Sequence, residues 1–337
     1  MTVLKHPVVV IAGPTASGKS GLALDLAEAL NGVVINADSM QIYQDTPIIS
    51  AVPSAADKAR VPHRLYEIFP ADVNGSVVDW LNLAAAEIRS AWLAQKLPVV
   101  AGGTGLYLDN LINGTTPIPE TSAAVRQEVA ALLREYGVQA LHEKLREYDP
   151  ATAKRLSPND TTRVRRAYEV WRDTGVPLSV WYRKPMVKKL PEASFVVIKI
   201  IPGREELDSR CYRRWEQMLA AGALKEAAEL AARKLDSRLP AMKALGVPEL
   251  LAFVEGKCSL DEASAQAKLH TRQYAKRQMT WFKNKLAADI VLDSCYKGSP
   301  EEREKVIFDV KKRLLGLHNN VKGYKTQIIV NSNNPEI

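Results

Sequence analysis

The sequence of 337 residues predicts an α/β fold, in which a parallel sheet with flanking helices carries an all-helical insertion. Three observations lead to this prediction. An apolar run at 8–11 is followed by a glycine-bounded loop that ends in Lys19-Ser20. Further short apolar runs alternate with segments of helical periodicity, as in doubly wound sheets. Residues 121–187 show helical spacing alone, which predicts a helical lobe within the sheet domain.

The loop at 13–20 fits the phosphate-binding pattern G-x-x-x-x-G-K-[ST] at every fixed position, so the sheet is expected to be P-loop NTPase-like. Backbone N–H groups from Ala16 to Ser20 are expected to surround a phosphate, with the positive end of a helix at 22–30 pointing at it. Lys19 would neutralise charge, and Ser20 would hold Mg²⁺. The alternative is an ordinary strand-turn-helix, but no turn requires a Lys-Ser pair at its end.

The second predicted strand, at 33–36, is followed by Asp38. Because parallel strands deliver their carboxyl ends to one crevice, Asp38 is expected near the phosphate loop. It is therefore a candidate general base. The alternative, that Asp38 or Ser39 merely caps a helix, stays open on this segment alone.

The next segments lead to a third strand end. Four prolines interrupt residues 46–74, where we expect loops around short helices. A helix at 77–97 and a strand at 98–101 follow. Glycines at 102, 103 and 105 would permit close approach to a ligand, and Thr104 offers a hydroxyl at the crevice. No carboxylate stands at this strand end for a second Mg²⁺ contact, which argues against a nucleotide-hydrolysing motor.

The helical insertion contains a basic segment. Asn159 or Asp160 is expected to cap a helix whose first turns carry Arg163, Arg165 and Arg166. The helix dipole disfavours cations at this end, so they indicate contacts with an anion. A solvated charged face is the alternative.

Two later helices also carry cations. After a strand at 195–201, a helix bears arginines that are expected to reach over the phosphate crevice as a lid: Arg204, Arg210, Arg213 and Arg214. The helix at 272–286 has an apolar stripe that should face the core, formed by Ala275, Met279, Phe282 and Leu286. Beside it runs a basic stripe of Arg272, Lys276 and Lys283, flanked by Tyr274 and Trp281. Aromatic residues among cations suit nucleic acid, although Trp and Tyr are more often found in cores. A strand at 289–293, a helix at 300–315 and a loosely held polar tail at 318–337 complete the prediction.

Composition limits the function classes. The net charge of +8 favours a polyanionic partner, and the basic residues concentrate at 163–189 and 272–285, away from the phosphate loop. The three cysteines are isolated and odd in number, as expected of free thiols in the cytoplasm. No apolar run is long enough to span a bilayer and no secretory signal precedes the first strand, so we expect no membrane association.

The motifs together resemble those of the tRNA dimethylallyltransferases, over about residues 8–293. The motifs that carry the resemblance lie, in family order, at 13–20, 36–43, 61–63, 102–107, 159–166, 243–246 and 271–282. The resemblance implies transfer of a dimethylallyl group from dimethylallyl diphosphate to N6 of the adenosine 3′ to the anticodon, position 37, in tRNAs that read codons beginning with U. It also implies release of diphosphate, a tRNA anticodon stem-loop as partner, a monomer and a bacterial form without a zinc finger.

The resemblance assigns roles to residues. Asp38 would accept the proton from the adenine amine, and Thr104 would orient it. The diphosphate would be held, with Mg²⁺ at Ser20, by Gly13, Thr15, Ala16, Ser17, Gly18, Lys19, Ser20, Arg210 and Arg214. The tRNA would be bound by Asp38, Ser39, Met40, Gln41, Thr104, Thr162, Arg163, Val164, Arg165, Arg166, Arg272, Lys276, Arg277, Trp281 and Lys283.

The expected division of the chain is a catalytic core at 1–116 and 191–299, a tRNA-binding helical insertion at 117–190, and a C-terminal helix and tail at 300–337. Two departures from the family pattern stand out. Thr162 replaces a usual Gln, and the segment after Asp45 lacks the usual Gly-Thr and nearby Lys. Three alternatives remain at this point: a P-loop nucleotide kinase, an isopentenyltransferase acting on free adenylate, and a non-enzymatic RNA-binding module.

Overall fold

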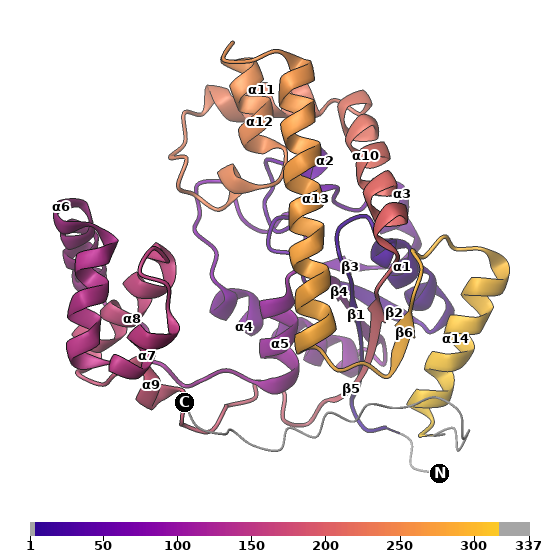
Figure 1. Cartoon of the computed structure of the whole chain (residues 1–337). Helices are drawn as coiled ribbons and strands as arrows, with labels where there is room; N and C mark the ends of the chain where they lie inside the picture. Colours follow the sequence, from indigo (N-terminus) through magenta and orange to yellow (C-terminus); the bar gives the residue numbers. More distant parts are fainter. Residues whose placement is uncertain (1–3, 317–337) are drawn as a thin grey trace.

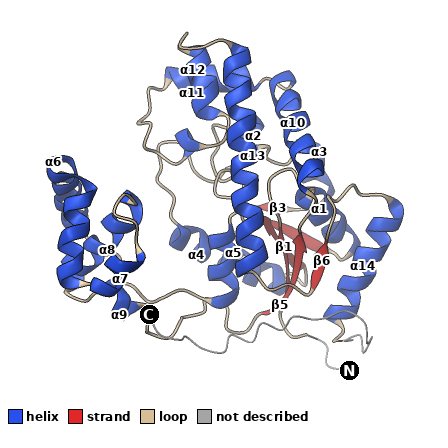
Figure 2. Cartoon of the chain, viewed as in Figure 1, coloured by secondary structure: helices blue, strands red, loops and turns tan. Residues whose placement is uncertain are grey.

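The computed structural model describes residues 4–316 and is built around a parallel six-stranded sheet (Figures 1 and 2). The strands lie in the order β3-β2-β4-β1-β5-β6. Their bounds are β1 (Pro7–Ala12), β2 (Gly32–Asn36), β3 (His63–Arg64), β4 (Leu97–Gly102), β5 (Ser194–Ile200) and β6 (Ile290–Leu292). The central strands are apolar along their whole length because helices cover both faces of a parallel sheet.

Each face of the sheet has its own hydrophobic core. One face packs against α1 (Lys19–Ala29) and α14 (Pro300–Leu314). The other packs against α4 (Val77–Leu93), α5 (Gly105–Asn113) and α13 (Leu260–Lys285). Alternate side chains of β1 serve the two cores, with Val9 and Ile11 in the first and Val8 and Val10 in the second.

A helical lobe stands apart from the sheet, at the left of Figure 1. It consists of α6 (Ala123–Tyr148), α7 (Pro150–Arg155), α8 (Thr161–Thr174) and α9 (Leu178–Trp181). The lobe has hydrophobic clusters of its own. Its two connections to the sheet domain meet in an antiparallel bridge between Thr115 and Val187.

A second group of helices lies beyond the carboxyl ends of the strands, toward the top of Figure 1. It includes α10 (Arg204–Ala220), α11 (Ala223–Ala232), η1 (Ala241–Lys243) and α12 (Val247–Val254). Two short helices, α2 (Pro47–Ser50) and α3 (Ala55–Arg60), complete this region. The long helix α13 runs from this group down across the sheet domain to α5, so one helix spans both.

The predicted fold class is confirmed, with corrections to several element bounds. The helix predicted at 77–97 ends at Leu93, and the strand after it already begins at Leu97. Helix α1 begins at Lys19, three residues earlier than predicted. Helix α13 begins at Leu260, twelve residues early, because its first turns bury only Ala263 and Ala267 and give a weak apolar pattern. The two-residue strand β3 was not predicted. The tail predicted at 318–337 lies outside the described residues. Among residues 4–316, no helix combines the length and the apolar character needed to cross a bilayer.

The end of β4 allows a test of sheet packing. A Cβ atom on Gly102 would lie 2.0 Å from the carbonyl oxygen of Ala37, whereas one on Gly203 would meet nothing within 4 Å. Gly102→Ala should therefore destabilise the fold by about 1–3 kcal/mol or more, the usual cost of overpacking. Gly203→Ala is the matched control and should leave the stability close to wild type. Urea denaturation measures both, and equal midpoints for the two variants would contradict the packing seen at β4.

Candidate active site

The phosphate loop between β1 and α1 is held from outside by a residue far along the chain. Gly18 has a left-handed φ of 91°, and a Cβ atom there would lie 2.3 Å from the carbonyl oxygen of Tyr296. The Tyr296 N–H donates to the Ser17 carbonyl at 2.9 Å, and its hydroxyl donates to the Asp25 carboxylate at 2.7 Å. The loop therefore needs glycine at 18 both for its backbone angle and for space.

Lys19 places a cation at the end of this loop. Its Nζ donates to the Pro14 carbonyl at 3.1 Å. Desolvation in the cleft lowers the pKa of the Lys19 ammonium to about 8; the carboxylate of Asp38 opposes this shift and the guanidinium of Arg214 adds to it. A bound anion would raise this pKa and further favour the charged form. The predicted diphosphate contact of the Ser17 side chain is not supported, because Ser17 is fully buried and its hydroxyl lies beside Gly13, away from the cavity lining.

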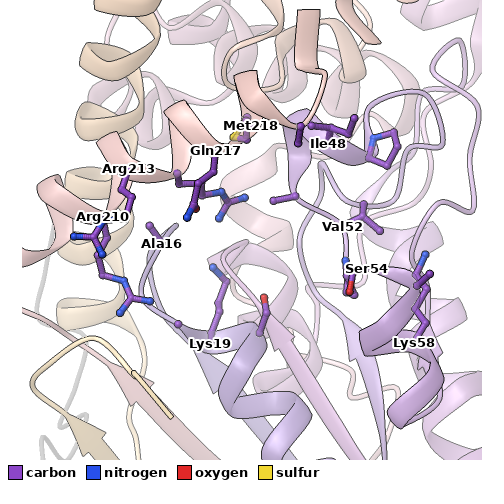
Figure 3. A pocket seen from close by; sticks show the side chains of 18 of the residues that line it. Ala16, Lys19, Ile48, Val52, Ser54, Lys58, Arg210, Arg213, Gln217 and Met218 are labelled. Atoms are coloured by element: carbon purple, nitrogen blue, oxygen red, sulfur yellow. The ribbon is translucent and has the colours of Figure 1, made fainter. Parts of the chain in front are cut away.

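A cavity of about 930 Å³ opens above the loop. Figure 3 shows Lys19 pointing into it, with Arg210 and Arg213 from α10 on one side and Lys58 from α3 on the other. The prediction that α10 covers the phosphate crevice therefore holds for Arg210, Arg213 and Arg214. Arg204 instead lies one turn from Asp208, with its Nε 3.8 Å from that carboxylate.

Arg214 connects this cavity with a second one. One guanidinium nitrogen donates to the Thr15 hydroxyl at 3.4 Å and another to the Ser50 carbonyl at 3.2 Å. Burial lowers the pKa of the guanidinium, while Asp38 and Cys211 act in the opposite direction. The second cavity, of about 230 Å³, is lined by Arg214 and Asp38 together. An anion between Lys19 and Arg214 would thus lie near a carboxylate.

Asp38 is positioned by the end of β2. The Asn36 side chain is fully buried; its Oδ1 accepts the Asp38 N–H at 2.8 Å and its Nδ2 donates to the Asp38 carbonyl at 3.0 Å. The Asp38 Oδ1 accepts the Met40 N–H at 3.0 Å. The next helix begins only at Pro47, with Thr46 as its N-cap, so the alternative that Asp38 or Ser39 caps a helix is wrong.

Thr104 joins the loop after β4 to the turn that carries Asp38. Its Oγ1 accepts the Ser39 N–H at 2.9 Å, and its hydroxyl donates to the Ser39 hydroxyl at 3.2 Å. Its backbone N–H donates to the Ala37 carbonyl at 3.2 Å. The two strand ends thus bring Thr104 and Asp38 together at one crevice, as predicted from the parallel sheet.

The second cavity has an aromatic and basic wall from α13. Tyr274 and Arg277 line it together with Asp38. Burial raises the pKa of the Tyr274 phenol, and Asp38 adds to the shift, so this hydroxyl stays protonated at neutral pH. A planar group that enters between Asp38 and Tyr274 would meet a carboxylate acceptor and an aromatic ring.

The segment that departs from the family pattern after Asp45 forms the other wall. The buried carboxylate of Glu226 accepts the N–H groups of Ile48 and Ile49, both at 2.8 Å, and so fixes the start of α2. The Gln41 amide donates to the carbonyls of Ser50 and Ala51 at 3.0 and 2.8 Å. Gln41, predicted to bind tRNA, therefore uses both of its N–H donors to hold this wall.

Only part of the predicted basic stripe on α13 is available to bind a partner. The Arg272 Nε lies 3.0 Å from the Asp208 carboxylate, so this residue is engaged within the protein. Lys276, Arg277 and Lys283 are exposed. Trp281 is half-buried against α5, where a Cβ atom on Gly105 would reach its ring at 2.5 Å.

The predicted RNA-contacting segment of α8 is capped by Asp160, which accepts the Arg163 N–H at 3.1 Å. Thr162, Arg163 and Arg165 are exposed. Val164 is fully buried in the lobe, so a contact between RNA and its side chain is ruled out, which corrects that part of the prediction. Arg166 is half-buried and donates to the Thr121 hydroxyl at 3.1 Å.

Four residues that hold the site were given no role by the sequence: Asn36, Tyr296, Glu226 and Gln278. Tyr296 and Glu226 act through hydrogen bonds to segments distant in the sequence, which no local sequence pattern predicts. Gln278 carried a usable signal, because it is polar on the apolar face of α13, between Ala275 and Phe282. A buried polar residue on such a face requires hydrogen-bond partners, and Gln278 finds them in both crevice loops.

Known proteins resemble this chain over most of its length. A family model described as IPP transferase matches residues 41–285. A tRNA dimethylallyltransferase of Rhodospirillum centenum is 51% identical over 283 residues, which cover 84% of this chain and 90% of that protein. Another, of Rhodopseudomonas palustris, is 50% identical over 278 residues, with coverages of 82% and 88%.

Solved structures agree with these relatives. A full-length tRNA isopentenylpyrophosphate transferase of Bacillus halodurans superposes with a TM-score of 0.66 at 33% identity, covering 92% of this chain and 97% of that one. A eukaryotic dimethylallyltransferase acting on tRNA superposes with a TM-score of 0.82 at 27% identity, with coverages of 94% and 81%.

The pKa of Lys19 allows a test of anion binding. Since a bound anion raises a pKa that is about 8 in the free site, binding above pH 8 should take up a proton. Because this proton must be taken up, the affinity for inorganic diphosphate should decrease above pH 8, and Lys19 should contribute about one log unit of this decrease per pH unit. Calorimetry in two buffers of different ionisation enthalpy measures the uptake. Lys19→Arg, which stays charged throughout, should lose this contribution; identical profiles would contradict the assignment.

Proposed function

The chain belongs to the IPP transferase family, that of the tRNA dimethylallyltransferases, and from this premise we propose that it transfers a dimethylallyl group from dimethylallyl diphosphate to N6 of adenosine 37 in tRNA. One observation carries the residue assignment. Asp38 and Arg214 line one cavity, and Arg214 with Lys19 lines the next, so a carboxylate and a diphosphate-sized anion site are adjacent. The crevice can hold the leaving group of one substrate beside a base for the other.

We place the donor diphosphate on the phosphate loop. The backbone N–H groups of Ala16, Gly18, Lys19 and Ser20 would bind its oxygens, since those of Thr15 and Ser17 are donated to Gln278 and to the Pro14 carbonyl. The Lys19 ammonium and the guanidinium groups of Arg210 and Arg214 would surround the diphosphate. When the carbon–oxygen bond of the donor breaks, the electron pair leaves with the diphosphate. Cations fixed around that oxygen stabilise the growing charge more than they stabilise the bound substrate, which lowers the barrier.

We place the acceptor adenine in the second cavity, between Asp38 and Tyr274. The amine nitrogen forms the new carbon–nitrogen bond and loses one proton, which the Asp38 carboxylate accepts. The Thr104 hydroxyl, beside Ser39, would orient the amine. The adenine must leave its stack to reach this position, and the Tyr274 ring offers it a new stacking surface.

Mg²⁺ is compatible with these residues as a companion of the diphosphate. Within residues 4–316, no three His, Cys, Asp or Glu side chains gather into a group that could hold a metal ion. Mg²⁺ commonly binds through one protein oxygen, waters and substrate phosphates, and the exposed Ser20 hydroxyl at the cavity can supply that oxygen. The ion would neutralise part of the diphosphate charge.

We assign the tRNA anticodon stem-loop to two surfaces, the exposed cations of α13 and the arginines of α8 in the lobe predicted at 117–190. The core at 1–116 and 191–299 would hold the chemistry. The proposal also includes three further points. The modified tRNAs are those that read codons beginning with U, the protein is located in the cytoplasm, and it acts as a monomer. A nucleotide kinase, an adenylate transferase and a non-enzymatic RNA-binding module lose support, since the matched relatives are named as tRNA transferases.

The direct test incubates the protein with Mg²⁺, labelled dimethylallyl diphosphate and unmodified tRNA. We expect label in N6-dimethylallyladenosine after nuclease digestion. Transfer to free adenylate but not to tRNA, or phosphate transfer from ATP, would replace the proposal by one of its alternatives.

Asp38 provides a more specific prediction. Asp38→Asn keeps an oxygen that can accept the Met40 N–H but removes the base, so the single-turnover rate should fall by roughly 10²- to 10⁴-fold. Binding of tRNA should change little. A rate within a few-fold of wild type would mean that another group takes the proton. Ser39→Ala is the neighbouring control and should lose far less, because Thr104 can still accept the Ser39 N–H.

The tRNA surface predicts a salt effect. Lys276 and Arg277 are exposed on α13, so the double variant Lys276→Ala, Arg277→Ala should bind tRNA more weakly and with a shallower slope of log affinity against log salt. Each lost phosphate contact should reduce the slope by roughly 0.7 to 0.9. Salt titrations by filter binding or anisotropy provide the measurement.

The matched control removes two exposed lysines elsewhere. Lys305→Ala with Lys311→Ala on α14 changes the net charge by the same amount, without touching α13. We expect it to retain the wild-type slope. If both double variants give one slope, the α13 cations are ordinary surface charges.

A further inference from the structure

Gln278 is the side chain through which α13 reaches both loops of the crevice. It is only 6% exposed. Its Oε1 accepts the Thr15 N–H at 2.8 Å, and its Nε2 donates to the Gly103 carbonyl at 2.8 Å. A neutral amide suits this position because it presents an acceptor and a donor at once. A carboxylate would lack the donor for Gly103.

The two contacts of Gln278 belong to different halves of the site. Thr15 lies in the phosphate loop, and its hydroxyl accepts a hydrogen bond from Arg214. Gly103 precedes Thr104, which holds the turn of Asp38. A Cβ atom on Gly103 would lie 2.5 Å from the Gln278 Nε2 and 3.4 Å from the Asp38 Oδ2, so the amide reaches this loop only because position 103 is glycine. One amide therefore links the donor loop to the acceptor carboxylate.

The opposite side of the same helix faces solvent. Lys276 and Arg277, two residues and one residue before Gln278, are exposed, and a hollow of about 530 Å³ runs along this side past Trp281. Arg277 stands at the edge of the helix face and lines both this hollow and the second cavity. Under the proposed function, on which this inference rests, the hollow faces tRNA. A small displacement of α13 by a bound polynucleotide would move Gln278 and both loops together, because the amide is hydrogen-bonded to each loop at 2.8 Å.

We propose that Gln278 is a positioning residue that fixes the spacing between the phosphate loop and Asp38 and couples polynucleotide binding on α13 to binding of the diphosphate donor. The coupling is reciprocal: RNA on α13 tightens the donor site, and the donor tightens the RNA site by the same factor. Without the amide, each substrate still binds, but the reacting atoms are misaligned.

Two variants separate the hydrogen bonds from the packing. Gln278→Met keeps a similar volume and makes neither bond. Gln278→Glu keeps the acceptor for Thr15 but loses the donor to Gly103 while it is ionised. Once protonated, the introduced carboxyl has a donor and an acceptor again, so lowering the pH should restore part of its activity relative to wild type at the same pH. Asp38 and Tyr274 are the titratable neighbours, and Tyr274 is hydrogen-bonded to Gln278. Because an introduced carboxylate would also act on these two groups, the recovery is followed in the coupling factor at each pH as well as in the activity.

The experiment measures kcat and KM for both substrates, and the affinity for an unreactive thiolodiphosphate analogue of the donor with and without a synthetic anticodon stem-loop. For wild type we expect the RNA to tighten the analogue by at least about fivefold, within the usual range of such coupling. For Gln278→Met we expect kcat to fall by about 10- to 100-fold, as for other small misplacements of reacting groups. Affinity for the analogue alone should change by less than about threefold, and the coupling factor should approach one.

Gln266→Met is the matched control, because Gln266 is exposed on the same helix, three turns earlier. It should behave as wild type. If Gln278→Met does not fold, Gln278→Glu decides alone through its pH-dependent recovery. A folded variant at position 278 with wild-type kcat and coupling, or with a loss in KM alone, would overturn the inference. Failure of wild type to modify tRNA would instead overturn the proposed function, so the two failures are distinguishable.

Discussion

The charge balance at the phosphate loop is the constraint on which the rest of the site depends. The charged ends of Lys19 and Arg214 are both desolvated, and Asp38 is the carboxylate that faces them. Two cations against one anion in a cleft are costly unless a further anion completes the set. Desolvation is the main cause of the lowered pKa of Lys19, and the neighbouring charge of Arg214 adds to it. The arrangement is therefore suited to an anionic ligand, and a diphosphate supplies the missing charge.

The fold maintains this arrangement of charges through hydrogen bonds to the backbone of the crevice loops. Tyr296 fixes the outer side of the phosphate loop, Asn36 fixes the turn of Asp38, and Glu226 fixes the wall formed by α2. Each of these groups satisfies buried N–H or carbonyl groups that would otherwise be unpaired. The crevice is thus assembled from strand ends whose loops are tied together by side chains from distant segments.

The sequence predicted those parts of the fold and site that depend on local pattern. Strands buried on both faces are continuous apolar runs, so β1, β2, β4 and β5 were recognisable, and the parallel topology then placed Asp38 and Thr104 in one crevice. Arg210 and Arg214 were anticipated because they share a helix that follows β5. The sequence did not predict the contacts of Glu226 or Tyr296, because their partners lie 177 or more residues away. It also left Arg272 among the free cations, since its pairing with Asp208 requires α10 and α13 to be neighbours.

Helix α13 shows why a helix with a modest apolar stripe can organise two substrates. Its first turns bury only alanines, so packing against α12 and α10 is close but weakly specific. Phe282 and Leu286 anchor its other end in the main core. Between these ends the buried face carries Gln278, whose two hydrogen bonds fix the rotation and register of the helix where apolar contacts alone would leave both less defined. With this register fixed, Tyr274 faces the second cavity while Lys276 and Lys283 face solvent, so one polar residue on the inner face determines what the outer face presents to a polynucleotide.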